Sequence, residues 1–142
     1  MWGGAAAASR AVPARWRTPS GRSRPWATVF LRGAPAALVG YSFGAWVALR
    51  VAAAAPARVV AVVAVAPPFD FLDWDFLAAV TPRATLVVGE RDQFCAPERL
   101  ARVRAAHGER IAFRTIPHAD HFFVGCEDEI AAAVLDALNA LT

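Results

Sequence analysis

From residue 36 to the end of the chain, short apolar runs alternate with stretches whose apolar residues recur at helical spacing. The run at residues 59–65 contains only valine and alanine, which indicates a strand that is buried on both faces. We expect strands at residues 36–40, 59–65, 85–89 and 111–116, and helices at residues 43–55, 75–79, 97–107 and 127–141. Because strands that alternate with helices form right-handed β-α-β units, the pattern predicts an α/β fold, a parallel sheet with helices on both faces.

The first 35 residues differ from the rest of the chain in composition. They are rich in Ala, Gly, Pro, Ser and Arg, and they lack an apolar periodicity that could bury one face. We therefore expect residues 1–35 to be a disordered or poorly ordered basic tail, followed by one domain at residues 36–142. Within the tail, residues 26–31 fit either a helical turn or a short strand. An arginine-rich front also resembles a mitochondrial transit peptide, but Pro13, Pro19 and Pro25 interrupt an amphipathic helix.

The formal net charge is +3, and all 15 basic residues are arginines. The arginines at the front of the chain precede the first acidic residue, Asp70. A basic front can attract phosphate, but neither interleaved aromatic residues nor a recognition-helix pattern accompanies it, so we expect no nucleic-acid binding. The longest apolar run, residues 59–68, is far shorter than the ~20 residues of a membrane-spanning helix, so we also expect no membrane partner.

The two cysteines, Cys95 and Cys126, have neither C-x-x-C spacing nor the spacing of metal ligands. We expect them to be free thiols, and we expect no bound metal and no cofactor. A chain of 142 residues with two cysteines and no secretory signal fits a reducing compartment, so we expect a cytoplasmic protein.

The sequence Gly-Tyr-Ser-Phe-Gly at residues 40–44 lies between an apolar strand and a helical pattern. This G-x-S-x-G context is typical of a nucleophile elbow, in which the serine occupies a strained turn and its hydroxyl is raised above the sheet edge. We expect glycine at both Gly40 and Gly44 because a Cβ at either position would collide where the strand and the helix cross. Ser42 is therefore the candidate nucleophile.

Three candidate segments directly follow expected strands, namely Ser42, the loop at residues 90–97 and the loop at residues 118–123. The carboxyl ends of parallel strands share one edge of the sheet, and ligands bind at that edge. A serine hydroxyl needs a base to take its proton, and the base works best beside a buried carboxylate. The residues alone leave both partners open. His118 and His121 are candidates for the base, while the acid could come from Asp92, Glu90 or Asp70.

Four segments carry a family resemblance: GYSFGAWVAL (40–49), VAPPFDF (65–71), TLVVGERDQFCAPERL (85–100) and IPHADHFFVG (116–125). Over about three quarters of its length the chain resembles the α/β-hydrolase superfamily, in particular its small, lidless, dienelactone-hydrolase-like serine hydrolases. The resemblance implies a partial α/β-hydrolase fold that comprises the last four strands. It also implies the order nucleophile, acid, base, which selects Ser42, Asp92 and His121, and it assigns the first oxyanion donor to the backbone N–H of Phe43.

The activity that the resemblance implies is hydrolysis of small carboxylic esters or thioesters through an acyl-enzyme. In relatives, a second oxyanion donor comes from a loop after an earlier strand, and we expect this chain to lack that loop because it is truncated at its N-terminus. The alternative is an inactive remnant or an interaction protein. In that case the strand before Ser42 would have an uncovered edge, through which copies of the chain could associate.

Overall fold

The computed structural model describes residues 34–140. Our expectations for residues 1–33, which include nearly all of the basic tail and the short apolar stretch at 26–31, lie outside the described residues. The proposed boundary between residues 35 and 36 therefore stays a prediction. None of the helices in the described range is long and apolar enough to cross a membrane.

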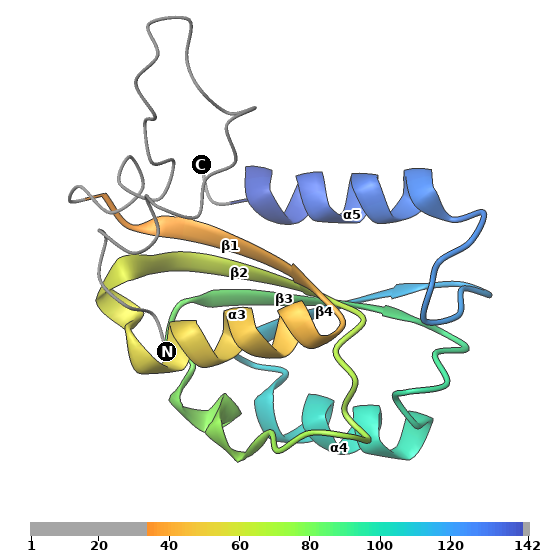
Figure 1. Cartoon of the computed structure of the whole chain (residues 1–142), viewed down its shortest axis with the longest axis horizontal. Helices are drawn as coiled ribbons and strands as arrows, with labels where there is room; N and C mark the ends of the chain where they lie inside the picture. Colours follow the sequence, from red (N-terminus) through yellow and green to blue (C-terminus); the bar gives the residue numbers. More distant parts are fainter. Residues whose placement is uncertain (1–33, 141–142) are drawn as a thin grey trace, which may run out of the picture. The chain divides into compact units, whose positions relative to one another are not determined.

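Within residues 34–140, four strands form one parallel sheet in the order β1-β2-β3-β4 (Figure 1). The strands are β1 (Ala36–Tyr41), β2 (Val59–Val65), β3 (Arg83–Gly89) and β4 (Ile111–Ile116). The register places Gly40 beside Ala64 and Ala64 beside Leu86. The prediction of a parallel sheet is confirmed, and all four carboxyl ends meet at the same edge.

Helices cover both faces of this sheet, as the sequence predicts. Figure 1 shows α3 (Phe43–Ala54) and α4 (Pro97–His107) on one face and α5 (Glu127–Asn139) on the other. Among the described residues, two short 3-10 helices, η2 (Pro56–Arg58) and η3 (Asp75–Ala79), lie in the connections. The expected helix at residues 75–79 is thus a 3-10 helix, and α3 and α5 end slightly earlier than expected, as is common where helix ends fray.

Two apolar clusters form the core, one on each side of the sheet. Successive side chains of β2 alternate between them, because Val62 and Ala64 belong to the cluster with α3, whereas Val63 and Val65 belong to the other. The face of α5 that packs against the second cluster carries Ile130, Ala133, Val134, Ala137 and Leu138. Burial on both faces fixes the position of β2, and with it the strand ends that carry the candidate site.

Candidate active site

Ser42 lies between β1 and α3 in a backbone conformation that serine seldom adopts, with φ 53° and ψ −119°. Such a conformation costs about 1–3 kcal/mol and persists only where the surroundings enforce it. Here the Ser42 N–H donates to the carbonyl of Val65 at 2.8 Å, and the Ser42 carbonyl accepts from the N–H of Ala45 at 2.9 Å. These two bonds join the turn to the neighbouring strand and to the helix, so the elbow geometry that the sequence predicts is present.

The two glycines that flank Ser42, Gly40 and Gly44, differ in how much room a Cβ would have. A Cβ at Gly40 would lie 2.1 Å from the carbonyl oxygen of Gly44 and 2.8 Å from the nitrogen of Ala45, which no side chain permits. At Gly44, apart from its two chain neighbours and the nearby backbone of its own helix, no described residue lies within 4 Å of the position a Cβ would take. Our expectation of a collision is therefore correct for Gly40 and wrong for Gly44, because a Cβ on Gly44 would enter space that the described residues leave open.

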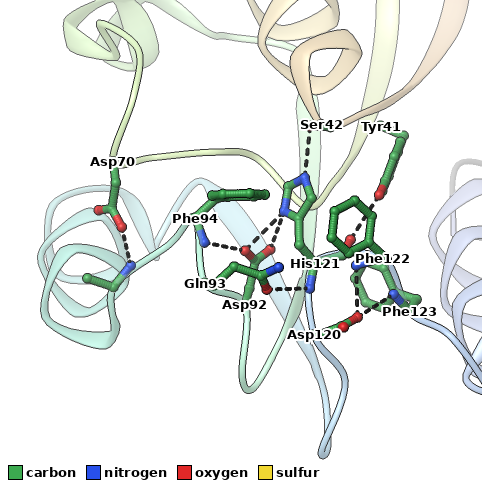
Figure 2. A network of polar contacts seen from close by, with 11 residues as sticks. Tyr41, Ser42, Asp70, Asp92, Gln93, Phe94, Asp120, His121, Phe122 and Phe123 are labelled. Carbon is green, nitrogen blue, oxygen red and sulfur yellow. Dashed lines mark hydrogen bonds and ion pairs between the residues drawn. The ribbon is translucent and has the colours of Figure 1, made fainter.

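Ser42, His121 and Asp92 form a continuous hydrogen-bonded relay (Figure 2). The Ser42 Oγ lies 2.9 Å from His121 Nε2, and His121 Nδ1 lies 2.9 Å and 3.0 Å from the two carboxylate oxygens of Asp92. His121 is only 2% exposed and Asp92 only 6%. A carboxylate can only accept, so Nδ1 carries the hydrogen and Nε2 is left as the acceptor for the serine hydroxyl.

The rival base, His118, lies on the exposed surface and is engaged elsewhere. Its backbone N–H donates to Glu90 Oε2 at 2.7 Å, and its Nδ1 lies 3.5 Å from the same oxygen and 3.3 Å from Arg91 Nη2. Glu90, a rival for the acid, is thereby bound to the loop of His118. Neither residue joins the relay.

Asp70, the remaining candidate for the acid, and Asp120, the neighbour of His121 in sequence, have structural partners as well. Asp70 follows β2, and its Oδ2 accepts from the backbone N–H of Ala96 at 2.8 Å, just before α4 begins. Asp120 adjoins His121 in sequence, but its Oδ1 accepts from the backbone N–H groups of Phe122 and Phe123 at 2.9 Å and 3.0 Å. Among the sequence candidates for the acid, the structure places Asp92 alone against the imidazole, within the part of the chain that it describes.

No protein-family model and no curated protein matches the sequence, but solved structures do. A protein of unknown function from Agrobacterium tumefaciens, provisionally assigned as an α/β-hydrolase, is 27% identical with a TM-score of 0.69. That match covers 74% of this chain and 50% of the other. An α/β serine hydrolase without a lid from Xanthomonas campestris is 25% identical with a TM-score of 0.62, over 73% of this chain and 46% of the other. The chain belongs to the α/β-hydrolase superfamily.

A third member of this superfamily, an α/β serine hydrolase homologue from Coxiella burnetii, is 27% identical with a TM-score of 0.56, over 72% of this chain and 48% of that protein. The present chain thus spans about half the length of these three structures. The predicted superfamily and the predicted partial α/β-hydrolase fold are both confirmed. The roles of Ser42, Asp92, His121 and Phe43 remain predictions, which the geometry supports.

Phe43 is the first residue of α3, so its backbone N–H has no acceptor within the helix. The N-terminal end of a helix also carries partial positive charge, which favours an anion. Phe43 directly follows Ser42, so this N–H lies beside the hydroxyl that would attack a carbonyl. These features fit the predicted role of Phe43 as an oxyanion donor.

Sequence reasoning missed three residues that hold the relay in place. The backbone N–H of Phe94 donates to Asp92 Oδ1 at 2.8 Å, and Gln93 Oε1 accepts from the backbone N–H of His121 at 3.2 Å. The Tyr41 hydroxyl donates to the carbonyl of His121 at 3.0 Å. The bond from Phe94 was foreseeable, because aspartate in turns commonly accepts from the N–H two residues later. The other two depend on how separate loops meet, which local sequence does not reveal.

Two further groups near the relay, the Tyr41 hydroxyl and the Cys95 thiol, stay protonated at neutral pH. Partial burial, followed by the negative charges of Asp92 and Asp120, raises the pKa of Tyr41, so its hydroxyl stays a neutral donor. Burial, reinforced by the carboxylates of Asp92 and Asp70, raises the pKa of Cys95 to about 12, which argues against a thiolate nucleophile at neutral pH. Within residues 34–140, no group of three or more His, Cys, Asp or Glu side chains is arranged to hold a metal ion.

Proposed function

We propose that the protein is a serine hydrolase that cleaves small carboxylic esters or thioesters through an acyl-enzyme. The observation that carries the proposal is the relay itself, with 2.9 Å from Ser42 Oγ to His121 Nε2 and 2.9 Å from His121 Nδ1 to Asp92 Oδ2. A buried aspartate, a histidine with one fixed tautomer and a serine in a strained elbow are the parts that activate a hydroxyl nucleophile. Likeness to α/β serine hydrolases supports the same conclusion.

In the acylation step, Ser42 Oγ attacks the carbonyl carbon of the substrate while its proton moves to His121 Nε2. The carboxylate of Asp92 stabilises the imidazolium that forms, without taking a proton itself. The carbonyl oxygen becomes an oxyanion, to which the Phe43 N–H donates. The tetrahedral intermediate then collapses, and His121 returns the proton to the leaving oxygen or sulfur as its bond to carbon breaks.

In the deacylation step, water takes the place of the leaving group. His121 Nε2 accepts a proton from this water as the water oxygen attacks the ester carbon of the acyl-enzyme. A second oxyanion forms and collapses, the carboxylic acid leaves, and the proton on His121 returns to Ser42 Oγ. The cycle consumes one ester or thioester and one water, and it needs no cofactor.

A fluorophosphonate probe tests this proposal because it reacts readily with an activated serine hydroxyl and not with an unactivated one. We expect labelling at one residue, identified by peptide mass spectrometry, and we expect Ser42→Ala to abolish it. Ser20→Ala and Ser23→Ala are matched controls that should label like the parent chain. Labelling that survives Ser42→Ala would show that the elbow serine is not the nucleophile. A parent chain that takes no label would favour the alternative, an inactive or interaction protein.

The expected location in the cytoplasm also remains a proposal. Both thiols that the sequence predicts to be free, Cys95 and Cys126, are unpaired in the structure. Free cysteines are typical of reducing compartments, which supports that location.

A further inference from the structure

Three phenylalanines are linked to the imidazole of His121 by ring contacts, Phe94 and Phe122 directly and Phe71 through Phe94. Each comes from the loop after a different strand. Phe71 follows β2, Phe94 follows β3 and Phe122 follows β4. The Phe94 and Phe122 rings lie edge-on to the imidazole at 4.5 Å and 5.5 Å between centroids, and 6.4 Å from each other. Phe71 packs on Phe94 at 5.3 Å. We call Phe71, Phe94 and Phe122 the aromatic rim.

Two members of the aromatic rim are exposed, although their near neighbours in sequence are buried. Phe71 is 67% exposed and Phe122 59%, whereas Phe69 is 1% and Phe123 2% exposed. The core therefore uses Phe69 and Phe123, and the two rim rings contribute little to it. Large apolar side chains that gather on a surface, rather than lying there singly, mark a binding site.

The position of the rim relative to the relay indicates which part of a substrate it would contact. In the proposed reaction His121 Nε2 donates its proton to the oxygen or sulfur of the leaving group. That leaving atom must therefore come within about 3 Å of Nε2. The group attached to the leaving atom then lies beside the imidazole, where Phe94 and Phe122 pack. The oxyanion lies instead at the Phe43 N–H, next to Ser42. The rim is thus on the side of the leaving group.

The charges at the rim favour an uncharged leaving group. The Asp92 carboxylate accepts from the backbone N–H of Phe94, and the Asp120 carboxylate accepts from that of Phe122. The charge of Asp92 faces the imidazolium that forms on His121 during the reaction, so the Asp120 carboxylate is the negative charge that acts at the rim. An anionic leaving group would meet like charge there, and it would also lose hydration against phenyl rings.

We propose that the aromatic rim binds the leaving group, so that the preferred substrates are esters or thioesters of uncharged, apolar alcohols or thiols, aryl ones above all. This inference rests on the proposed hydrolase function. The physical gain is burial of apolar leaving-group surface against Phe71 and Phe122, which a small or charged leaving group cannot provide.

A series of acetate esters with one acyl group and different leaving groups tests the rim. Phenyl acetate is compared with 2-naphthyl acetate, which adds a fused apolar ring, and with 3-carboxyphenyl acetate, which adds a negative charge. We expect kcat/KM to rise about fivefold for the naphthyl ester and to fall about tenfold for the carboxyphenyl ester. The deacylation rate should be the same for all three, because they share one acetyl-enzyme.

The variants Phe71→Ala and Phe122→Ala should bring the naphthyl-to-phenyl ratio of kcat/KM towards one. Leu135→Ala is the matched control, since Leu135 is an exposed apolar residue on α5, and it should keep the parent ratio. Each rate is divided by the amount of reactive Ser42, titrated with fluorophosphonate, so that a partly unfolded variant does not mimic a specificity change. Phe94 is left unchanged because its N–H holds Asp92.

Two results would overturn the rim proposal while leaving the hydrolase proposal intact. One is an unchanged naphthyl-to-phenyl ratio in both variants when Ser42 still reacts. The other is a change in oligomeric state on gel filtration caused by Phe71→Ala or Phe122→Ala, which would make the rim a protein interface. If Ser42 of the parent chain neither takes the label nor turns over any ester, the hydrolase proposal fails and the rim proposal fails with it.

Discussion

His121 is held at four points, each by a different residue. Asp92 binds Nδ1, Ser42 binds Nε2, the Gln93 side chain accepts from the backbone N–H, and the Tyr41 hydroxyl donates to the backbone carbonyl. These partners come from the elbow and from the loop after β3, so two strand ends fix the loop after β4. A base fixed in this way needs little rearrangement when a substrate arrives, which is a condition for efficient proton transfer.

The first prediction compares the two histidines of that loop. His121→Ala removes the base, and we expect kcat on a nitrophenyl ester to fall about 10²–10⁴-fold. His118→Ala removes an exposed side chain that contacts Glu90 and Arg91, and we expect kcat to stay within about threefold of the parent value. Steady-state kinetics on both variants checks this. Equal losses would mean that the relay in the structure does not identify the base.

At the level of single residues, the sequence predicts the three members of the relay better than it predicts the residues that hold them in place by hydrogen bonds. The positions of Ser42, Asp92 and His121 follow from strand ends and from the family resemblance, and the structure brings all three together. Gln93 and Tyr41 could not be foreseen, because each bonds to the backbone of a loop that is remote in sequence. Such bonds depend on the distance between loops, and periodicity carries no information about that distance.

Among the elements, β1 and α3 matter most, because their crossing creates the elbow. The crossing is close enough that the backbone of Gly40 lies directly against that of Gly44. Sequence predicts both elements and the turn between them, because an apolar run, a glycine and a helical pattern follow one another. It does not tell which glycine is compressed, since that depends on the direction in which each Cβ would point. The structure shows that Gly40 is the compressed one.

The second prediction follows from this difference between the glycines. Gly40→Ala forces a methyl group into the backbone of Gly44, and we expect a loss of about 1–3 kcal/mol in the free energy of unfolding together with loss of fluorophosphonate labelling. Gly44→Ala meets no atom outside its chain neighbours and the backbone of its own helix, and it replaces glycine within α3, so we expect a gain of up to about 1 kcal/mol. Urea unfolding measures both changes. A similar loss in the two variants would contradict the assignment.

At the scale of the whole molecule, β1 is an edge strand of the described sheet, and its sequence does not discourage another strand from pairing with it. Among residues 34–140, β1 pairs with β2 and with no other strand. Its sequence, Ala-Ala-Leu-Val-Gly-Tyr, contains no charge or proline that would discourage pairing, and Val39 is 53% exposed. Association of copies of the chain through this strand stays a prediction.

The last prediction tests that edge in solution. We expect the purified chain to form species larger than a monomer in a concentration-dependent way, because a free strand edge presents unpaired N–H and C=O groups to a second copy. Val39→Lys places a charge on β1 and should shift the light-scattering mass towards the monomer. Leu135→Lys adds the same charge on α5 and serves as the control, since it should leave the association unchanged if β1 is the contact. A parent chain that stays monomeric at all concentrations would show that β1 is covered, and association that Leu135→Lys weakens as much as Val39→Lys does would place the contact elsewhere.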